Sequence, residues 1–473
     1  MDNTLDNEDL QRRMWLDNGW WLGEGVPKFY RTFKPRLYFS ELYGLVTQEK
    51  FNRSVVLMGP RRVGKTVLLH HVIQRLLTSK HADNFDILYL SLETPIYQEL
   101  SLEALFNAFQ RQRPIGSAKT CYVFFDEIQY LPDWEVHLKS LTDTYREVQF
   151  VVSGSAAAAL RLKSRESGAG RFTDFDLPPL TFHEYLNMRD RLSLIRPVTG
   201  SWNGKPIKRY DTPNVQALNQ ELVRYINWGS YPEIVNTPLT SKEASRYLKD
   251  DVVAKVLSRD LPNLYGITNP LELNRLLLTL AINTGGEVNT SHMARDAKIE
   301  LRTLQRYLDY LEAAYLIHRI PRIDEHGKAF KRNHHLKVYL TNPAMYAGLL
   351  TPVEETNHAL MGQLVETAIY AQWYHRKPLL AYARWRRGEV DIIGLKQRDR
   401  TPGFAVEVKW SDRFVEQPKK LKGLIGFAKQ HQLERVVFTT ITKQGSLEVD
   451  GITLEYLPAS LYCYTVGRRT FEP

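Results

Sequence analysis

The sequence predicts an α/β protein whose first part is a parallel sheet that carries a phosphate-binding loop. Three observations lead to this fold class. A short apolar run, residues 54–58, is followed by a glycine loop and then by a helical stretch. A second apolar run, residues 121–125, ends in the carboxylates Asp126 and Glu127. Between residues 50 and about 180, strand-like and helix-like segments alternate, which is the pattern of βαβ units with helices on both faces of a sheet.

The glycine loop matches G-x-x-x-x-G-K-[ST], the pattern of a loop that cradles phosphates when it lies between a strand and a helix. Its members are Gly59, Pro60, Arg61, Arg62, Val63, Gly64, Lys65 and Thr66. The glycines allow a tight turn in which backbone N–H groups converge on an anion, and the following helix adds the positive end of its dipole. We expect Lys65 to reach the β- and γ-phosphates of ATP and Thr66 to ligate Mg²⁺. The alternative is a chance glycine turn.

The second motif places two carboxylates at the end of a predicted buried strand, where open α/β sheets bind their ligands. We expect Asp126 to hold the hydration shell of Mg²⁺ opposite Thr66. Glu127 is expected to be the base that orients an attacking water. The alternative is a solvated strand end before the turn at residues 131–133.

Two further features follow the strand predicted at residues 150–155. Ser153 or Ser155 is expected to contact the γ-phosphate or the attacking water, or else to cap the next helix. Arg171, which follows a glycine, is a candidate arginine finger that acts in cis or across a subunit boundary. The alternative for Arg171 is a solvated side chain in a surface turn.

Periodicity and turn residues predict the remaining elements of the first half. Helices are expected at residues 67–77, 102–109 and 134–147, and strands at 54–58, 87–92, 121–125 and 150–155. Residues 1–50 are rich in aromatic side chains, which usually pack, so we expect an arm laid against the sheet and near the adenine pocket. A partner-binding arm is the alternative. Residues 51–185 would form the core and 186–265 a helical lid interrupted by a polar loop near residues 199–205.

Residues 266–350 show a helix-turn-helix pattern with two following strands, a winged helix. Helices are expected at residues 271–282, from 289 or 290, and at 301–312, and the wing strands at 317–322 and 336–340. The third helix of such a module enters the major groove of DNA, and here it would present Arg302, Gln305 and Arg306. The alternative is a packing module without nucleic acid.

Residues 351–473 carry a second set of polar residues on predicted elements. The elements are a helix at 362–370, strands at 385–393 and 404–410, a long helix at 416–430 and a strand at 435–440. Asp391 and Glu407 would hold Mg²⁺ through carboxylate oxygens, with Glu366 as an outer ligand from the helix. Lys409 would position a water or neutralise developing charge. The alternative is a charged, solvated face of a small sheet.

Taken together, these motifs resemble those of the bacterial and archaeal AAA-family ATPases that have a conserved C-terminal region of unknown function. The resemblance extends from about residue 35 onward. It is carried by residues 59–66, 126–127, 168–171, 179–185, 362–366, 389–391 and 407–409. It implies a P-loop ATPase core, a helical lid, a winged helix and a restriction-endonuclease-like α/β domain. The last motif resembles P-D…(D/E)-x-K, with Val390 where proline would stand.

The resemblance implies an ATPase with a Mg²⁺-dependent nuclease that acts on nucleic acid, DNA rather than RNA. Related fusions suggest, by analogy, defence against mobile DNA. The alternative is a regulatory ATPase switch whose C-terminal domain binds nucleic acid or a protein without cleavage. Homo-oligomers are compatible with either interpretation.

Composition agrees with a protein of several domains that works in the cytoplasm. The 473 residues are 43% hydrophobic and 25% charged, and the formal charge of +10 is compatible with a polyanionic partner. The two cysteines, Cys121 and Cys463, provide neither a disulfide framework nor a cysteine metal site. We expect no signal peptide and no membrane span, because the apolar run at residues 276–282 is too short to cross a bilayer.

Overall fold

The computed structural model describes residues 7–472 except 49–52, 116–119, 155–169, 203–204, 266, 268, 329–333, 377 and 387. The chain divides into two compact units, Met1–Pro178 and Pro179–Pro473. The first unit ends earlier than the predicted core end at residue 185. The reason is that α9 (Phe182–Met188) packs against α21 (Ala459–Arg469) inside the second unit.

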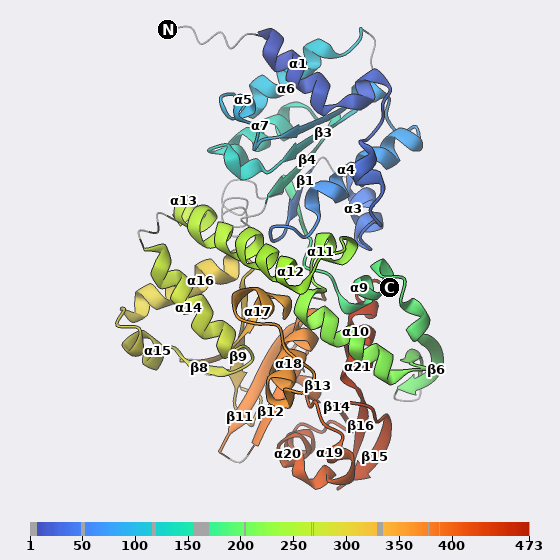
Figure 1. Cartoon of the computed structure of the whole chain (residues 1–473), viewed down its shortest axis with the longest axis vertical. Helices are drawn as coiled ribbons and strands as arrows, with labels where there is room; N and C mark the ends of the chain where they lie inside the picture. The colour runs from blue at the N-terminus through green and yellow to red at the C-terminus, as the bar shows by residue number, and fades with distance from the viewer. Residues whose placement is uncertain are drawn as a thin grey trace. The chain divides into compact units, whose positions relative to one another are not determined.

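The first unit is built on a five-stranded sheet with the order β2-β3-β4-β1-β5, in which every pairing is parallel (Figure 1). Its strands are β1 (Ser54–Met58), β2 (Ile87–Ser91), β3 (Cys121–Asp126), β4 (Val148–Gly154) and β5 (Phe172–Asp176). All residues of β1 and β3 are buried, as expected for parallel strands covered on both faces. The predicted parallel-sheet fold is confirmed.

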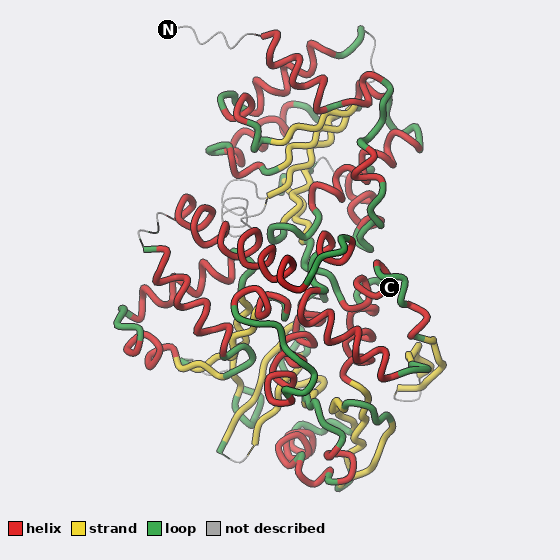
Figure 2. The backbone as a smooth tube through the Cα atoms, viewed as in Figure 1, coloured by secondary structure: helices red, strands yellow, loops and turns green. Residues whose placement is uncertain are grey.

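Helices surround this sheet, as the red and yellow tubes of Figure 2 show. They are α4 (Lys65–Thr78), α5 (Pro95–Gln98), α6 (Leu102–Gln112) and α7 (Trp134–Thr144), with short 3₁₀ turns at Asn84–Asp86 and Ile128–Tyr130. Helices α6 and α7 pack against each other, and α4 packs against α3 of the N-terminal segment.

The N-terminal aromatic segment forms α1 (Asn7–Asp17), a 3₁₀ turn (Gly19–Leu22), α2 (Lys28–Arg31) and α3 (Phe39–Val46). It covers β2, which is an edge strand of the sheet. Trp20 and Trp21 each donate an indole N–H to the carbonyl of Ile87 at 3.0 Å. Asn18 accepts from the N–H of Tyr89 at 2.7 Å and donates to its carbonyl at 3.0 Å. Side chains of this segment therefore satisfy backbone groups that an open sheet edge would leave exposed.

The second unit contains a nine-stranded sheet with the order β15-β16-β14-β13-β12-β11-β9-β10-β8 (Figure 1). Its strands are β8 (Glu287–Asn289), β9 (Ile317–Ile323), β10 (His335–Leu340), β11 (Leu379–Trp385), β12 (Gly388–Leu395), β13 (Pro402–Glu407), β14 (Arg435–Thr440), β15 (Gly445–Val449) and β16 (Ile452–Pro458). Strands β9 and β11 pair in parallel, Tyr382 with Arg322. The regions predicted as a winged helix and as a C-terminal domain therefore share one sheet.

Helices cover both faces of the C-terminal part of this sheet. The helices of the second unit, besides α9 and α21, are α10 (Val215–Trp228), α11 (Pro232–Asn236), α12 (Ser241–Tyr247), α13 (Leu261–Tyr265), α14 (Pro270–Ile282), α15 (Thr290–Asp296), α16 (Leu301–Ala313), α17 (Ala344–Leu349), α18 (His358–Tyr374), α19 (Arg413–Glu416) and α20 (Lys422–Gln430), and π-helical turns at Leu248–Ala254 and Val256–Asp260 lie between α12 and α13. Ile392 packs into the core that contains α18 and α21, whereas Ile393 packs into the core that contains α20. Successive residues of a strand point to opposite faces, so both faces are buried.

Two predicted helical regions differ from the structure. Where a helical lid with a polar loop near residues 199–205 was expected, the chain forms a two-stranded hairpin, β6 (Arg196–Trp202) and β7 (Lys205–Asp211). Each strand contains a proline, Pro197 or Pro206, and proline disfavours a helix interior. The long helix expected at residues 416–430 is broken into α19, a 3₁₀ turn at Pro418–Lys420 and α20, because Pro418 cannot continue the first helix.

We predict that Trp20→Ala lowers the free energy of unfolding by about 3–5 kcal/mol, because removal of a fully buried tryptophan leaves a cavity and one of the two indole hydrogen bonds to the carbonyl of Ile87 is lost. The measurement is urea denaturation followed by far-UV circular dichroism. The control is Leu22→Ala in the same 3₁₀ turn, whose side chain is 61% exposed and which we expect to change stability by less than about 0.5 kcal/mol. Equal effects of the two substitutions would contradict a packed arm.

Candidate functional site

The phosphate loop, residues 59–66, joins β1 to α4 and has a backbone that only particular residues adopt readily. Gly64 and Arg62 have positive φ values of 94° and 65°. A Cβ atom at Gly59, whose φ is 158°, would lie 2.3 Å from the carbonyl oxygen of Leu177. The turn therefore requires glycine where the chain passes closest to the segment after β5.

Two basic side chains contact the phosphate loop. The ammonium group of Lys65 is buried and donates to the carbonyls of Gly59 at 3.0 Å and Pro60 at 2.9 Å. Arg36, buried in the N-terminal segment, donates to the carbonyl of Val63 at 2.7 Å. Hydrogen bonds from Lys65 of the loop and from Arg36 of the N-terminal segment therefore stabilise the loop. Lys65 lies beside the turn that is expected to receive phosphates.

Asp126 is the centre of a hydrogen-bond network at the carboxyl edge of the sheet. Its Oδ2 accepts from the hydroxyl of Thr66 at 2.6 Å and from the hydroxyl of Tyr89 at 2.9 Å. Its Oδ1 accepts from the hydroxyl of Ser153. Strand β4 lies between β1 and β3, and this order brings Ser153 between the phosphate loop and Asp126. The predicted proximity of Thr66, Asp126 and Ser153 is therefore present in the structure.

Tyr89 is a member of this network that sequence reasoning missed. It lies on β2, next to β3 in the sheet, and its ring is close to that of His70, with 4.4 Å between centroids. The signal was weak, because a tyrosine within an apolar strand usually belongs to the core. Only the strand order shows that its hydroxyl reaches the carboxylate of Asp126.

Glu127 directly follows this network and has a left-handed backbone, with φ 56°. Its backbone N–H donates to the hydroxyl of Ser153 at 3.3 Å, and Gln129 donates to its carboxylate. Burial raises the pKa of the Glu127 carboxyl, and the ammonium group of Lys65 opposes this rise. A carboxylate whose pKa lies above its usual value is a stronger base once ionised, as general-base chemistry requires.

The arm also contributes an aromatic ring beside the phosphate loop. The ring of Tyr30 stacks on His70 with 3.7 Å between centroids. His70 donates from Nδ1 to the carbonyl of Thr66 at 2.8 Å when that nitrogen carries the proton. Burial lowers the pKa of His70 to about 4, so this imidazole is neutral at physiological pH. The expectation that the arm forms part of the adenine pocket stays a prediction.

Two predicted residues of this site are not brought to the loop. Ser155 lies outside the described residues. Arg171 precedes β5 at the amino edge of the sheet, where its carbonyl accepts from the N–H of Ser54 at 2.9 Å. Its guanidinium group forms a salt bridge with Asp143. The phosphate loop follows the other end of the five-residue strand β1, roughly 16 Å away along that strand. This placement does not fit an arginine finger that acts on the loop of the same chain.

The second candidate site, called here the acidic centre, combines Glu366, Glu389, Asp391 and Glu407 with Lys337 and Lys409. Strand β12 pairs with β13 in antiparallel register, Ile392 with Val406, which places Asp391 beside Glu407. Lys409 contacts Glu407 Oε1 at 2.7 Å and Asp391 Oδ2 at 3.7 Å. The structure thus brings together the predicted Asp391, Glu407 and Lys409, and Glu366 joins them through Lys337.

Lys337 is the residue of the acidic centre that sequence reasoning missed. Its ammonium group contacts Glu366 Oε1 at 2.9 Å, Glu389 Oε1 at 3.0 Å and Asp391 Oδ1 at 3.1 Å. Burial acts to lower the pKa of Lys337, but these carboxylates outweigh burial and raise it well above its usual value. The lysine is therefore charged. No local motif marks it, since it comes from β10, in the region predicted as a winged helix.

The carboxylates of the acidic centre differ in how well they are satisfied. Asp391 accepts from the N–H of Val408 at 2.9 Å, and Lys337, Lys409 and this N–H lower its pKa in spite of burial. Burial and the neighbouring Asp391 raise the pKa of Glu407 to about 8. Glu407 Oε2 is buried and has no hydrogen-bond partner. Negative charge is thus poorly compensated at Glu407, and a further cation there would relieve it.

Within the ranges that the structure describes, no group of three or more His, Cys, Asp or Glu side chains is arranged to hold a metal ion. At the acidic centre this leaves Asp391 and Glu407 as a pair of candidate ligands.

The described part of the chain also contains no helix with the length and apolar character needed to cross a membrane.

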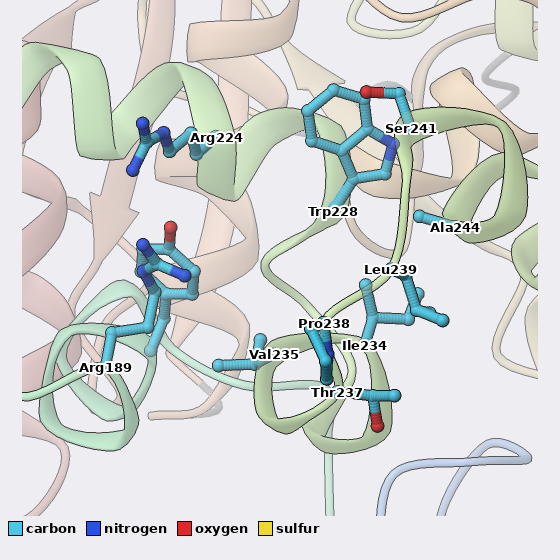
Figure 3. Close-up of a pocket in the computed structure, with 11 residues that line it drawn as sticks. Arg189, Arg224, Trp228, Ile234, Val235, Thr237, Pro238, Leu239, Ser241 and Ala244 are labelled. Atoms are coloured by element: carbon cyan, nitrogen blue, oxygen red, sulfur yellow. The ribbon is translucent and has the colours of Figure 1, made fainter.

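The second unit also has a pocket of about 250 Å³ that is lined by residues from α9 to α12, as Figure 3 shows. Apolar side chains, among them Ile234 and Leu239, form part of its wall. Arg189 and Arg224 contribute its basic side and both contact the buried carboxylate of Glu221, at 3.2 and 3.4 Å. The pocket lies outside both sequence motifs.

Comparison with known proteins bears mainly on the first unit. Residues 51–186 match a family described as an AAA domain, and residues 219–356 match a domain of unknown function. The parallel sheet with its phosphate loop and the AAA match together support a P-loop ATPase fold, as the sequence predicted. The matched region of unknown function ends before the acidic centre's Glu366, Asp391 and Glu407.

Three curated relatives are each 26% identical to the chain, and all are described as uncharacterized. One is from Haemophilus influenzae, over 280 residues that make up 58% of this chain and 64% of the relative. Two are from Methanocaldococcus jannaschii, over 272 residues (56% of each chain) and 296 residues (60% of each chain). The chain therefore spans less than two thirds of the length of these relatives.

Among solved structures, the Walker-type ATPase of Pyrococcus abyssi is similar with a TM-score of 0.40 and 15% identity, covering 69% of this chain and 97% of that one. The replication initiator DnaA bound to AMPPCP and single-stranded DNA gives a TM-score of 0.28 and 14% identity, covering 58% of this chain and 86% of that one.

We predict that Lys65→Ala weakens ATP binding by about 10- to 100-fold, because a charge-assisted hydrogen bond contributes roughly 1.5–3 kcal/mol. Isothermal titration calorimetry of the full chain with ATP and Mg²⁺ measures this change. Lys80→Ala, an exposed lysine just after α4, is the matched control and should bind ATP like the wild type. Unchanged affinity in Lys65→Ala would remove this lysine from the phosphate site.

Proposed function

We propose that the first unit binds and hydrolyses ATP at the phosphate loop. The observation that carries this proposal is the 2.6 Å hydrogen bond from Thr66 to Asp126, which joins the loop to the acidic end of β3. A nucleotide bound there would place its phosphates on the loop N–H groups and beside Lys65. The AAA match over residues 51–186 supports the same conclusion.

The residues present fit a magnesium ion that accompanies the nucleotide. Oxygen donors suit Mg²⁺, and Thr66 and Asp126 supply a hydroxyl and a carboxylate that already lie within hydrogen-bond distance. When bound, the ion would neutralise charge on the β- and γ-phosphates. Ser153 and Tyr89 hold the carboxylate of Asp126 in place through both of its oxygens.

Glu127 is the base in this proposal. Its carboxylate would accept a proton from the water that attacks the γ-phosphate, while Gln129 orients it by donating a hydrogen bond. Ser155, like Ser153, is proposed to contact the γ-phosphate or this water.

Arg171 retains one of its two predicted roles as a proposal. Because Arg171 lies at the amino edge of the sheet, the role that we propose is action across a subunit boundary, in which its guanidinium group contacts the nucleotide of a neighbouring copy. This role requires a homo-oligomer. It predicts that the turnover contributed by Arg171 depends on protein concentration, whereas a surface arginine would not affect turnover.

We predict that Glu127→Gln binds ATP with wild-type affinity but hydrolyses it about 10²- to 10⁴-fold more slowly, because the amide keeps the shape of the side chain and loses the base. Phosphate release under saturating ATP and Mg²⁺ measures turnover. The control is Glu99→Gln, an exposed glutamate of the same unit. Wild-type turnover in Glu127→Gln would assign the base to another residue.

The second candidate function is metal-dependent cleavage of nucleic acid at the acidic centre. The observation that favours it is the convergence of Asp391, Glu407 and Lys409 from two adjacent strands, with Glu366 reached through Lys337. The unpartnered Oε2 of Glu407 and the carboxylate of Asp391 fit one divalent ion, so Asp391 and Glu407 would hold it. Such an ion would polarise a phosphate. Lys409 would neutralise charge that develops on the phosphate, and Glu366 would orient groups around it.

Nucleic acid is the proposed partner of the second unit, DNA rather than RNA. Helix α16 exposes Arg302, Gln305 and Arg306, and the sheet that carries the acidic centre also carries β8, β9 and β10 beside this helix. The net charge of +10 supports attraction to a polyanion. Binding without cleavage is the alternative, in which the ATPase acts as a switch. Defence against mobile DNA follows from the resemblance alone.

We predict that the full chain cleaves DNA in Mn²⁺ or Mg²⁺, and that Asp391→Ala and Lys409→Ala each abolish cleavage while leaving ATP hydrolysis largely intact. The assay uses single- and double-stranded DNA, with DNA binding measured in parallel at two salt concentrations. Asp399→Ala, an exposed carboxylate near β13, is the control. DNA binding that weakens with salt but shows no metal-dependent cleavage would establish the regulatory alternative.

A further inference from the structure

The acidic centre contains two lysines with different surroundings. The side chain of Lys337 is 3% exposed and its ammonium group touches three carboxylates, Glu366, Glu389 and Asp391, at 2.9–3.1 Å. The side chain of Lys409 is 27% exposed. It touches Glu407 closely and Asp391 at 3.7 Å. Lys337 is therefore the enclosed cation of the centre, and Lys409 is the accessible one.

Strand geometry fixes Lys337 in this position. Within β10, Lys337 pairs with Ile320 of β9 on one side and with Glu287 of β8 on the other. Tyr339, two residues further along the same strand, points the same way and donates its hydroxyl to Glu366 Oε1 at 2.6 Å. Strand β10, paired on both sides, thus supplies both groups that satisfy Glu366, and the sheet fixes the backbone positions from which they extend.

The two ammonium groups divide the carboxylate oxygens into two sets. Glu366 Oε1, Glu389 Oε1 and Asp391 Oδ1 face Lys337. Asp391 Oδ2 and Glu407 face Lys409. The buried oxygen without a partner, Glu407 Oε2, belongs to the second set. Among the described carboxylates of the centre, the buried oxygen that lacks a partner therefore lies on the side away from Lys337.

We propose that Lys337 is a permanent cation of the acidic centre that takes the place of a second divalent ion, so that the centre holds a single divalent ion at Asp391 and Glu407. An ammonium group with three carboxylate partners occupies the volume and balances the charge that an ion between Glu366, Glu389 and Asp391 would otherwise take. The inference rests on the metal-dependent function proposed for this centre. It assigns to Lys337 a positioning role, because Lys337 acts through the carboxylates that it holds.

The test counts Mn²⁺ ions, with Mn²⁺ alone as the probe and the full chain free of nucleotide. Isothermal titration calorimetry is run on each variant with and without Asp391→Asn, and the sites lost with Asp391→Asn belong to the acidic centre. Any Mn²⁺ bound by the first unit cancels in this difference. We expect one lost site in the wild type and two in Lys337→Met, where the three carboxylates have lost their cation. Lys337→Arg keeps the positive charge, so we expect Asp391→Asn to remove one Mn²⁺ site in this variant, as in the wild type.

Each outcome supports or overturns a stated idea. No lost site in the wild type means that the centre holds no divalent ion, which overturns the metal-dependent function and this inference with it. Two lost sites in the wild type overturn the inference and leave the function intact. One lost site in both the wild type and Lys337→Met shows that Lys337 takes no ion's place.

A second variant covers the case in which Lys337→Met does not fold. Glu389→Gln removes one partner of Lys337 at a position where the side chain is 35% exposed. If Lys337 fills this side of the centre, Glu389→Gln keeps one Mn²⁺ site and changes its dissociation constant by less than about threefold. A loss of affinity of about tenfold or more, matching that of Glu407→Gln, would make Glu389 an ion ligand and overturn the proposal.

Discussion

Buried charge constrains both units of this chain, because an ion removed from water must find partners within the protein. In the first unit, Asp126 lies at the carboxyl edge of a buried sheet and accepts from three hydroxyl groups. In the second unit, Lys337 is surrounded by carboxylates from α18 and β12. In each unit, neighbouring strands and helices supply the hydroxyl groups or carboxylates that compensate the buried charge. The strand order of each sheet is therefore a condition for its site.

Local sequence motifs predicted the parts of each site that are contiguous in the chain. The phosphate loop and Asp126–Glu127 are flanked by strands and helices whose signals lie within a few residues, so loop and strand end were predictable. The β12–β13 pairing was predictable for the same reason. Tyr89 and Lys337 were not, because each reaches its site from a neighbouring strand, and sequence periodicity does not give strand order.

The sequence also misplaced features that depend on distant pairing. Arg171 follows a glycine and precedes a strand, and this local sequence is similar to that of a loop that carries a catalytic arginine. The parallel pairing of β5 with β1 places it at the amino edge, since Ser54 pairs with Phe172. Near Asp391, the register of β11 and β12 shifts so that Tyr382 alone faces Asp391 and Ile392. A shift of this kind redirects side chains in a way that alternation cannot predict.

The single nine-stranded sheet of the second unit has a mechanical consequence. Helix α16 packs against β9, β9 pairs with β11, and β11 pairs with β12, which carries Asp391. Sliding one strand past the next by one residue would exchange every side chain between the two faces of the sheet, so the register of these strands resists such a slip. A load applied at α16 would therefore reach the carboxylates as a strain in the sheet. The region predicted as a winged helix and the acidic centre are therefore joined by one continuous sheet.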